Sequence, residues 1–501
     1  MLRKIRLTLA VVFFALITLL FLDFTGTLHG WLSWMASIQF LPAVLALNFG
    51  VVAVLVVLTL VFGRIYCSVI CPLGVMQDVV SWVSGRRGKG RKRLRFTYSP
   101  AKSWLRYAVL AVFVLALVAG VGSLVALLAP YSSYGRIAQN LFQPVYTAGN
   151  NALAYMAERM DSYAFYNREV WLRSLPTFVI AAATFVIIAV LAWRGGRTYC
   201  NTVCPVGTVL GFLARFSWLK ITIDEDKCVS CGLCAKGCKA SCIDAKNHKV
   251  DYSRCVVCGN CLGNCHKDAL HYRHPKKAAC AGAAAAAGGK EVDASRRSFI
   301  MASAVAVTTA AIAQEKKKVD GGLAAITQKE ATKRVTPLTP PGSVSAQNMA
   351  QRCTACQLCV SECPNDVLRP STGLMTLMQP TMSYERGYCR PECHRCSDVC
   401  PAGAIKPIKA EEKSSIQIGH AVWSKKNCIV FTDGVECGNC ARHCPAGAIM
   451  MTPVDPDKED SVKFPAVNLS RCIGCGACEN LCPAKPFSAI HVEGNEVHKY
   501  I

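Results

Sequence analysis

The segment RIYCSVICPLG at residues 64–74 recurs without a gap as RTYCNTVCPVG at residues 197–207. Both copies have the pattern R-x-Y-C-x-x-x-C-P-x-G, and each follows a long apolar run. Cysteines four residues apart share one face of a helix, so the two copies bring four thiolates to one level of the fold. Soft thiolates suit an iron–sulfur cluster, Cu(I), Zn or a redox dithiol, and the alternative is burial as small apolar side chains. The four cysteines are Cys67, Cys71, Cys200 and Cys204.

Four apolar runs accompany this repeat, and each approaches the roughly 20 residues that a helix needs to cross a bilayer. Lys and Arg gather before the first run, between the second and the third, and after the fourth. The positive-inside rule therefore predicts an α-helical bundle of four spans over residues 1–220, with both of its ends in the cytoplasm and the bundle in a bacterial inner membrane. The four runs are 7–24, 41–63, 104–129 and 176–193.

The composition agrees with a membrane metalloprotein. The chain has 501 residues, of which 52% are hydrophobic and 18% charged, and this points away from a disordered or purely soluble protein. Its net charge of +24 is explained largely by the cytoplasmic loops, so we expect no nucleic-acid partner. The 30 cysteines stand in tight clusters, which indicates metal sites rather than disulfides. No histidine lies inside an apolar run and no CxxCH occurs, so haem is not expected, and no catalytic side-chain set is found.

Eight cysteines in residues 221–274 have the spacing of a bacterial two-cluster ferredoxin, which predicts a cytoplasmic domain of that kind. In such domains three cysteines of each group hold one [4Fe–4S] cluster and the fourth crosses to the other cluster. Zinc sites instead show two CxxC pairs that lie further apart. Cys242 remains an alternative ligand to Cys238. The two predicted sets are Cys228, Cys231, Cys234 and Cys265, and Cys255, Cys258, Cys261 and Cys238.

Four more groups of four cysteines lie in residues 314–501 and predict an α+β domain with four further [4Fe–4S] clusters. The first and last groups are regular, the second has a wider first gap, and the third has eight residues after its first cysteine. Six clusters then leave the four repeat cysteines, Cys242 and Cys280 unused. The four groups are Cys353, Cys356, Cys359 and Cys363; Cys389, Cys393, Cys396 and Cys400; Cys428, Cys437, Cys440 and Cys444; and Cys472, Cys475, Cys478 and Cys482.

The segment between the two ferredoxin regions has two parts. Residues 275–294 are rich in Ala, Gly and Lys and predict a flexible linker. Residues 295–313 carry paired arginines, a mild apolar run and an Ala-Ile-Ala end, which is the form of a twin-arginine export signal cleaved after Ala313; a fifth span or a short packed helix are the alternatives. Because that route carries folded cargo, we expect residues 314–501 in the periplasm, although Lys316–Lys318 opposes this.

These motifs together resemble two known families. Residues 1–275 resemble the NapH-type membrane ferredoxins, and residues 295–501 resemble the NapG-type four-cluster ferredoxins. The resemblance implies a fused quinol dehydrogenase of anaerobic respiration, which oxidises menaquinol or ubiquinol from the membrane quinone pool. It also implies a periplasmic acceptor, either a reductase of the nitrate-reductase type or a cytochrome. Similar four-cluster ferredoxins imply that the first outer cysteine group pairs with the fourth, and the second with the third.

Two questions stay open after this comparison. The duplicated motif also occurs in nitrous-oxide-reductase maturation proteins and in copper reductases associated with cytochrome oxidase, so a copper-binding or copper-reducing maturation factor is the alternative function. About 30 Å of hydrocarbon separates the inner from the outer clusters, and electrons would either cross it by quinone diffusion, cross it through a metal centre on the four repeat thiolates, or not cross it. A cytoplasmic electron donor is a further possible partner. As quinol contacts we predict polar groups at or near the membrane, namely Asn48, Arg64, Tyr66, Arg197 and Tyr199.

Overall fold

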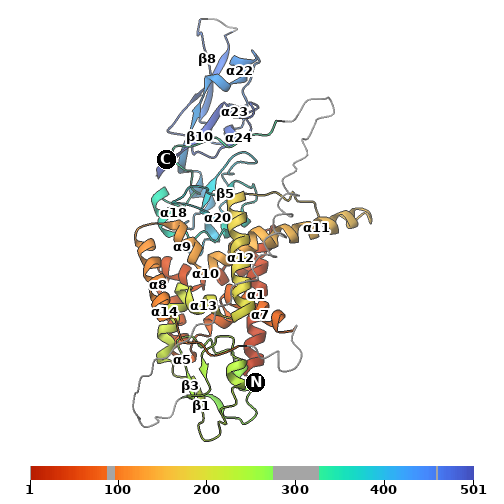
Figure 1. Ribbon diagram of the computed structural model, residues 1–501. Coiled ribbons are helices and arrows are strands. Elements are labelled where there is room, and N and C mark those ends of the chain that lie inside the picture. Colours follow the sequence, from red (N-terminus) through yellow and green to blue (C-terminus); the bar gives the residue numbers. More distant parts are fainter. Residues whose placement is uncertain (1, 87–95, 275–326, 458–460) are drawn as a thin grey trace, which may run out of the picture.

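The fold is described from a computed structural model, which covers residues 2–86, 96–274, 327–457 and 461–501. Three regions follow one another along a single direction (Figure 1). The helical bundle lies in the middle, the inner ferredoxin (residues 221–274) lies at the end that holds the N-terminus, and the outer region (residues 327–501) lies at the opposite end. The predicted linker, the predicted export signal with its cleavage position, Cys280 and the three lysines after the signal all fall outside the described residues.

The bundle is helical throughout. Its longest helices begin and end where the backbone demands it: α12 has Pro176 in its first turn, where no N–H is needed, and ends before Gly196, whose φ of +67° favours glycine. The elements are α1 (Leu2–Leu22), α2 (His29–Leu32), α3 (Trp34–Ser37), α4 (Phe40–Leu45), α5 (Phe49–Phe62), α6 (Tyr66–Val69), α7 (Pro72–Arg86), α8 (Ser103–Val118), α9 (Gly122–Leu128), α10 (Pro130–Ile137), the π-helix η2 (Ala138–Phe142), α11 (Gln143–Glu158), α12 (Leu175–Gly195), α13 (Thr198–Thr202), α14 (Pro205–Leu213) and the short 3-10 helix η3 (Ala214–Phe216).

Two of the four predicted spans form single helices. Among the described residues, α1 and α12 are long and apolar enough to cross a membrane. The run 41–63 is broken at Leu47, where φ is +56°, into α4 and α5, and the run 104–129 is broken at Gly120, where φ is +73°, into α8 and α9. The prediction of unbroken helices over these two runs was wrong, because a backbone turn with positive φ interrupts each of them.

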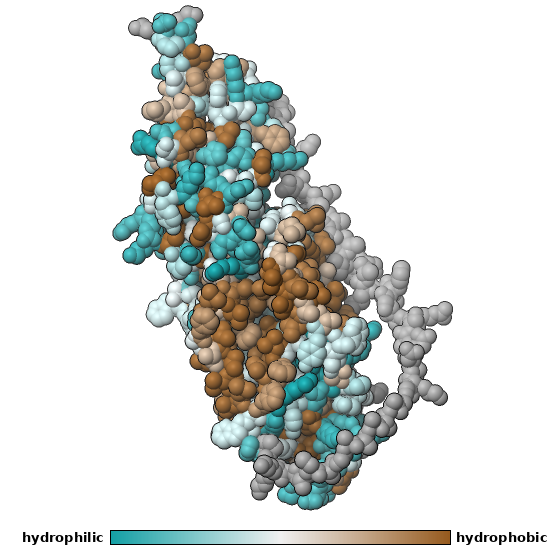
Figure 2. Space-filling view, turned by 90° about the vertical axis from the view of Figure 1, so that its left-hand side faces the viewer, coloured by the Kyte–Doolittle hydropathy of each residue, from teal (hydrophilic) through white to brown (hydrophobic). Residues whose placement is uncertain are grey.

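An apolar belt covers the middle of the molecule on the face shown in Figure 2, between polar surfaces at the two ends. A contiguous apolar surface of this extent marks a membrane or protein contact. The exposed apolar side chains belong to the long helices α1, α5, α8 and α12. They include Leu7, Val11, Val54, Val57, Leu115, Val118, Val179 and Ile187.

The two ends of the molecule are α+β, as the cysteine spacing predicts, and each is built from short helices and two-stranded antiparallel pairs. In the inner ferredoxin β1 pairs with β4 and β2 with β3; in the outer region β5 pairs with β6, β7 with β10, and β8 with β9. The inner elements are β1 (Lys220–Ile223), α15 (Leu233–Lys236), β2 (Ile243–Asp244), β3 (Lys249–Val250), α16 (Asn260–Gly263) and β4 (Leu270–Arg273). The outer elements are α18 (Ala346–Arg352), α19 (Leu358–Glu362), β5 (Leu368–Pro370), β6 (Pro380–Met382), α20 (Arg395–Asp398), α21 (Ala410–Lys413), β7 (Ile416–Trp423), η4 (Lys425–Asn427), α22 (Ile429–Thr432), α23 (Asn439–Arg442), β8 (Ile449–Pro453), β9 (Lys463–Val467), α24 (Ala477–Asn480) and β10 (Ile490–Tyr500).

The outer region rests directly on the outer end of the bundle. Asn140 Nδ2 donates a hydrogen bond of 3.1 Å to Gln357 Oε1. His29 Nδ1 lies 2.6 Å from Glu362 Oε2 and 3.2 Å from Asp23 Oδ2. Burial disfavours the charged imidazole, but the contacts with Asp23 and Glu362 outweigh burial and raise the pKa of His29 to about 9. The junction therefore contains a protonated histidine between two carboxylates.

Candidate iron–sulfur and thiol sites

The eight cysteines of the inner ferredoxin surround two hollows. The far inner set lines a cavity of about 50 Å³ and consists of Cys228, Cys231, Cys234 and Cys265. The near inner set, which faces the bundle, consists of Cys255, Cys258, Cys261 and Cys238. In both sets the fourth cysteine comes from the other sequence group, as the two-cluster pattern predicts.

Cys242 lies in the same hollow as the near inner set. Its thiol sulfur is 3.5 Å from that of Cys238, and it also contacts Cys255. The Cys238 thiol interacts with all three of the other ligands, Cys255, Cys258 and Cys261. This placement favours Cys238 as the fourth ligand and leaves Cys242 as a buried neighbour.

The four regular cysteine groups share one backbone conformation. In each group the residue before the second cysteine and the residue after it have positive φ, which turns the chain around the hollow. These pairs are Ser230/Gly232, Val257/Gly259, Ala355/Gln357 and Gly474/Gly476.

The fourth cysteine of several groups accepts a hydrogen bond from a backbone N–H, and such bonds to sulfur adjust the reduction potential of a cluster. The bonds run from Ala269 to Cys265, Ile405 to Cys400, Ala448 to Cys444 and Ala489 to Cys482, at 3.3–3.4 Å.

The outer cysteines also form four sets, but the predicted pairing of groups was wrong. Consecutive groups exchange their fourth cysteines: the first with the second, and the third with the fourth. Consecutive elements usually lie side by side, and the hairpin β5–β6 returns the chain from the first group to the second. The first outer set is Cys353, Cys356, Cys359 and Cys400, and the second is Cys389, Cys393, Cys396 and Cys363. The third is Cys472, Cys475, Cys478 and Cys444, and the fourth is Cys428, Cys437, Cys440 and Cys482.

These sets follow one another away from the bundle. The first outer set lies against the bundle, since the Cys356 and Cys400 thiols interact with the buried Tyr131 of α10. The second and third sets are joined by a hydrogen bond of 2.9 Å from the backbone N–H of Cys389 to the carbonyl of Cys475. The helices α22 and α23, which accompany the fourth set, lie toward the end of the molecule away from the bundle (Figure 1).

The duplicated motif brings its four thiols together inside the bundle. Each of the four cysteines is 4% exposed, and the Cys204 thiol interacts with those of Cys200, Cys71 and Cys67. Gln77 Nε2 donates to Cys200 Sγ at 3.2 Å, and the backbone N–H of Gly207 donates to Cys204 Sγ at 3.3 Å. We call this group the four-thiol site.

The arginine of each motif copy donates a hydrogen bond to a cysteine carbonyl of the other copy. Arg64 of the first copy donates to the carbonyl oxygen of Cys200 at 3.3 Å, and Arg197 of the second copy donates to the carbonyl oxygen of Cys67 at 2.5 Å. Both arginine side chains are fully buried. The motif therefore specifies a reciprocal contact, which explains why the same arginine stands in both copies.

The motif glycines make room for this reciprocal contact. A Cβ at Gly74 would clash with the Cys67 carbonyl and lie 2.6 Å from Arg197 Nη1. A Cβ at Gly207 would clash with the Cys200 carbonyl and lie 2.9 Å from Arg64 Nη2. No other residue fits at either position without moving backbone.

The buried charges around the two arginines differ. Arg197 Nε donates to Asp78 Oδ1 at 2.7 Å; Lys239 lies 2.6 Å from the same carboxylate and Arg6 also pairs with it. Burial disfavours the charged carboxylate, but these three cations hold the pKa of Asp78 well below its usual range. The sequence analysis did not find this hub, because the three cations lie far from Asp78 in the chain.

Arg64 has no such carboxylate among the described residues. It donates to Asn201 Oδ1 and to the carbonyl of Ser253, both at 2.9 Å, and the groups beside it that can become anionic are the thiols of Cys67 and Cys200. A fully buried cation requires a nearby negative charge. Deprotonated, metal-bound thiolates at the four-thiol site would supply that charge, so the residues present fit an anionic metal–sulfur group.

The predicted quinol contacts do not form one site. Asn48 caps the start of α5, with its Oδ1 accepting from Val51 N at 3.3 Å, whereas Arg64 follows the other end of this 14-residue helix, about 20 Å away. Tyr66 donates to Gln39 Oε1 at 3.0 Å, and Tyr199 donates to the carbonyl of Leu128 at 3.3 Å. The two motif arginines are occupied by the reciprocal contact described above.

Two family models match the chain. The one described as a 4Fe-4S binding domain matches residues 44–90 and 176–223, which contain the two motif copies. The one described as a 4Fe-4S dicluster domain matches residues 435–485. No solved structure matches the chain.

Several curated proteins are similar to parts of the chain. The methylamine utilization ferredoxin-type protein MauM of Methylobacillus flagellatus is 28% identical over 173 residues, which cover 32% of this chain and 69% of that protein. The ferredoxin-type protein NapF of Escherichia coli is 25% identical over 179 residues, covering 36% of this chain and 99% of NapF. The putative electron transport protein YccM of Escherichia coli is 24% identical over 223 residues, covering 42% and 54%. The chain is thus an iron–sulfur electron-transfer protein of the ferredoxin type.

Proposed function

We propose that this protein is a membrane-bound quinol dehydrogenase, which takes electrons from menaquinol or ubiquinol and delivers them to a periplasmic acceptor such as a nitrate-reductase-type reductase or a cytochrome. One observation carries the proposal. The cysteine sets form a continuous row from the inner ferredoxin, through the four-thiol site in the bundle, to the outer end of the molecule. A row of this kind serves to carry electrons along the whole length of the chain.

The apolar belt supports a bundle that lies within a bilayer. The helices α1 and α12 cross as single spans, and the broken pairs α4–α5 and α8–α9 complete the crossing. The backbone at each break is satisfied by hydrogen bonds to the preceding helix, from Asn48 N to Ala43 O and from Val121 N to Ala116 O. The basic loops then place the inner ferredoxin in the cytoplasm and the outer region in the periplasm. The export signal expected at residues 295–313 accounts for the passage of the outer region.

We assign a [4Fe–4S] cluster to each of the six ferredoxin sets, with Cys238 as the fourth ligand of the near inner set, and a seventh metal–sulfur centre to the four-thiol site. Such clusters, when bound, take up and release one electron at a time. The protein's own contribution is positive charge along the row. Arg64 next to the four-thiol site and Arg136 next to Cys356 are both fully buried, and neither pairs with a carboxylate among the described residues.

A series of electrostatically interacting side chains lies between the four-thiol site and the first outer set. The Tyr199 side chain interacts with the Cys200 and Cys204 thiols on one side and with Arg136 on the other. Arg136 in turn interacts with the Cys356 thiol of the first outer set. Of the three routes considered from the sequence, this path supports transfer through a centre on the four thiolates.

The test uses the purified full chain under anaerobic conditions. A reduced menaquinol analogue is added, and cluster reduction is followed by EPR. We expect prompt reduction of outer-set signals, among which that of the first outer set is identified by its loss in Cys356→Ala. If quinol gives no reduction while dithionite reduces the same clusters, the protein is not a quinol dehydrogenase.

The convergence of four buried thiols also favours the copper alternative, because Cu(I) prefers thiolate ligands. The double variant Cys67→Ala/Cys204→Ala separates the two functions. Loss of bound copper with quinol oxidation intact would establish the maturation factor. Loss of electron transfer between the inner and outer clusters, with no copper in the wild-type protein, would establish the electron conduit.

A further inference from the structure

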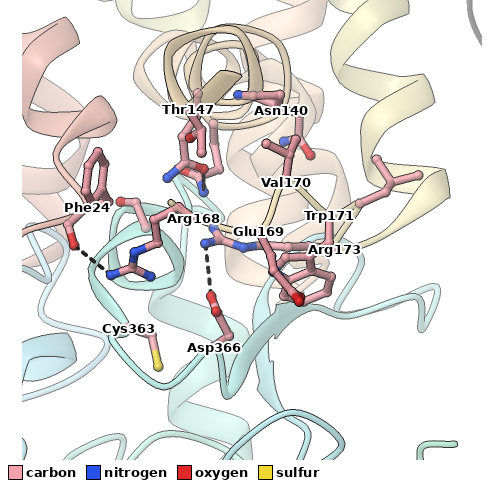
Figure 3. A pocket seen from close by; sticks show the side chains of 15 residues that line it. Phe24, Asn140, Thr147, Arg168, Glu169, Val170, Trp171, Arg173, Cys363 and Asp366 are labelled. Atoms are coloured by element: carbon pink, nitrogen blue, oxygen red, sulfur yellow. Dashed lines mark hydrogen bonds and ion pairs between the residues drawn. The ribbon is translucent and has the colours of Figure 1, made fainter. Parts of the chain in front are cut away.

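A cavity of about 70 Å³ lies where the outer end of the bundle meets the outer region (Figure 3). Its walls come from four segments: Phe24 just after α1, the π-helix η2 with the start of α11, residues 168–173 just before α12, and the outer region at Cys363 and Asp366. None of the quinol contacts predicted from the sequence lies in this lining.

The cavity borders the ends of both helices that are long enough to cross a membrane. Phe24 lies two residues after the end of α1, and Arg173 lies two residues before the start of α12. At the same level α11 extends sideways from the bundle and exposes apolar side chains such as Val145 and Met156, as helices in a membrane interface do (Figure 1). A molecule dissolved in the lipid would reach the cavity at this level.

Two residues that line the cavity each carry a buried polar atom with no hydrogen-bond partner among the described residues. One is an acceptor, Gln139 Oε1, and the other is a donor, Arg173 Nη1. Gln139 is 4% exposed, and its amide nitrogen donates to Gln143 Oε1 at 2.5 Å, which fixes the direction of the free oxygen. A buried polar group without a partner loses the hydrogen bonds it made to water, so a ligand that satisfies both atoms is favoured.

The remaining walls combine aromatic rings with polar and charged side chains. Phe24 and Trp171 line the cavity, with the guanidinium of Arg168 5.4 Å from the centre of the Phe24 ring and that of Arg386 4.3 Å from the centre of the Trp171 ring. The π-helix widens the turn that carries Gln139 and Asn140, and single π turns recur at functional sites. A hydroxyl-bearing aromatic ring with an apolar tail therefore fits the shape and chemistry of the site.

We propose that this cavity binds the headgroup of the quinol, an assignment that rests on the proposed function. One quinol hydroxyl donates to Gln139 Oε1, and an oxygen accepts from Arg173 Nη1. Oxidation breaks the two O–H bonds and converts both C–O bonds to C=O, releasing two protons and two electrons. The electrons leave one at a time to the [4Fe–4S] cluster of the second outer set, which is the oxidant and whose ligand Cys363 lines the cavity. The protons pass to water at the rim, where Glu169 is exposed.

Binding and electron transfer are measured separately on the full chain in lipid nanodiscs. A fluorescent hydroxyquinoline N-oxide, a quinol analogue, reports binding by quenching. Gln139→Leu removes the free acceptor at constant size, and Trp171→Leu removes the aromatic wall from a different segment. Gln351→Leu, on an exposed face of α18, is the matched control. Iron content and dithionite-reducible EPR signals establish that each variant is assembled.

We expect Gln139→Leu to weaken probe binding about tenfold or more, with quinol-driven reduction slowed to match, and Gln351→Leu to leave both unchanged. Unchanged binding in assembled Gln139→Leu and Trp171→Leu, with quinol oxidation intact, overturns the site and leaves the proposed function standing. Probe binding that is sensitive to Gln139→Leu in a protein that quinol cannot reduce supports the site and overturns the proposed function. A wild-type protein that neither binds the probe nor accepts electrons from quinol overturns both.

Discussion

The two copies of the duplicated motif have the same backbone contact and different charge surroundings. Arg197 faces Asp78, which stands four residues after the glycine of the first copy, whereas the matching position in the second copy is Gly211. Arg64 faces the neutral Asn201 instead. One buried arginine is thus neutralised by protein and the other by whatever the four thiolates hold. The comparison teaches that a metal–sulfur centre, as proposed for the four-thiol site, would be part of the charge balance of the fold.

The largest effect is expected from Asp78→Asn, which removes the carboxylate that Arg6, Arg197 and Lys239 share. Leaving buried cations without a partner typically costs about 3–5 kcal/mol. Thermal or denaturant unfolding of the detergent-solubilised protein measures this loss. The control is Asp244→Asn, in an exposed turn of the inner ferredoxin, which should change stability by less than about 0.5 kcal/mol. Equal stability of the two variants would contradict the charge hub.

The second largest effect is expected from Gly207→Ala, and from Gly74→Ala in the other copy, because each disrupts the reciprocal arginine–carbonyl contact between the two motif copies. Each new methyl group would meet a backbone carbonyl and an arginine, and overpacking of this kind costs about 3 kcal/mol. We expect both variants to lose metal from the four-thiol site, measured by metal analysis. Gly85→Ala in α7 is the matched control: its methyl group meets nothing within 4 Å, so it should stabilise the helix slightly.

The charge difference between the copies is sharpened by Asn201→Asp, which gives Arg64 a carboxylate of its own. A negative charge added beside the four-thiol site makes electron uptake there harder. At an effective dielectric constant near 20, the reduction potential of the four-thiol site should fall by roughly 100 mV, which corresponds to about 2 kcal/mol. Potentiometric titration followed by EPR measures it. A potential that stays constant or rises would show that Arg64 is not balanced by the thiolate centre.

The smallest effect is a pH dependence of stability, which comes from the junction between the bundle and the outer region. The buried cation there is a histidine, which titrates, whereas the motif copies contain arginine, which stays charged. Because the pKa of His29 is raised from its ordinary value near 6.5 to about 9, its contribution to stability is complete below pH 6.5 and is lost as pH rises through 9. The melting temperature of the wild type should therefore fall over this interval relative to that of His29→Gln. Parallel pH profiles for the two proteins would refute the role of the junction.

The cysteine spacing located the metal-binding loops because each loop is local in the chain. Ligands with two residues between them adopt the same turn in each regular group, as Ser230/Gly232 and Ala355/Gln357 illustrate. The exchange of the fourth cysteine between groups depends instead on which loops the strand pairs bring together, and spacing carries no information about that. The pairing expected from resemblance was therefore wrong.

The breaks in the apolar runs and the charge hub were equally inaccessible for physical reasons. Leu47 adopts a positive φ that leucine rarely takes, so its residue type does not predict the break between α4 and α5. Gly120 takes a positive φ more readily and could have indicated the break between α8 and α9. Asp78 acquires its role from cations that lie far away in the chain, at Arg6, Arg197 and Lys239. Long-range contacts of this kind come from tertiary packing alone.

The exchange of ligands between consecutive cysteine groups has a consequence for biogenesis. Each pair of outer sets is complete once its second group has been synthesised, so the first pair closes at Cys400 before any ligand of the second pair exists. The contacts that close a pair are short in sequence separation, which favours rapid and independent folding. Cluster insertion can then proceed in two separate stages. A chain whose synthesis ends between Cys400 and Cys428 would contain all the ligands of the first pair of sets and none of the second pair.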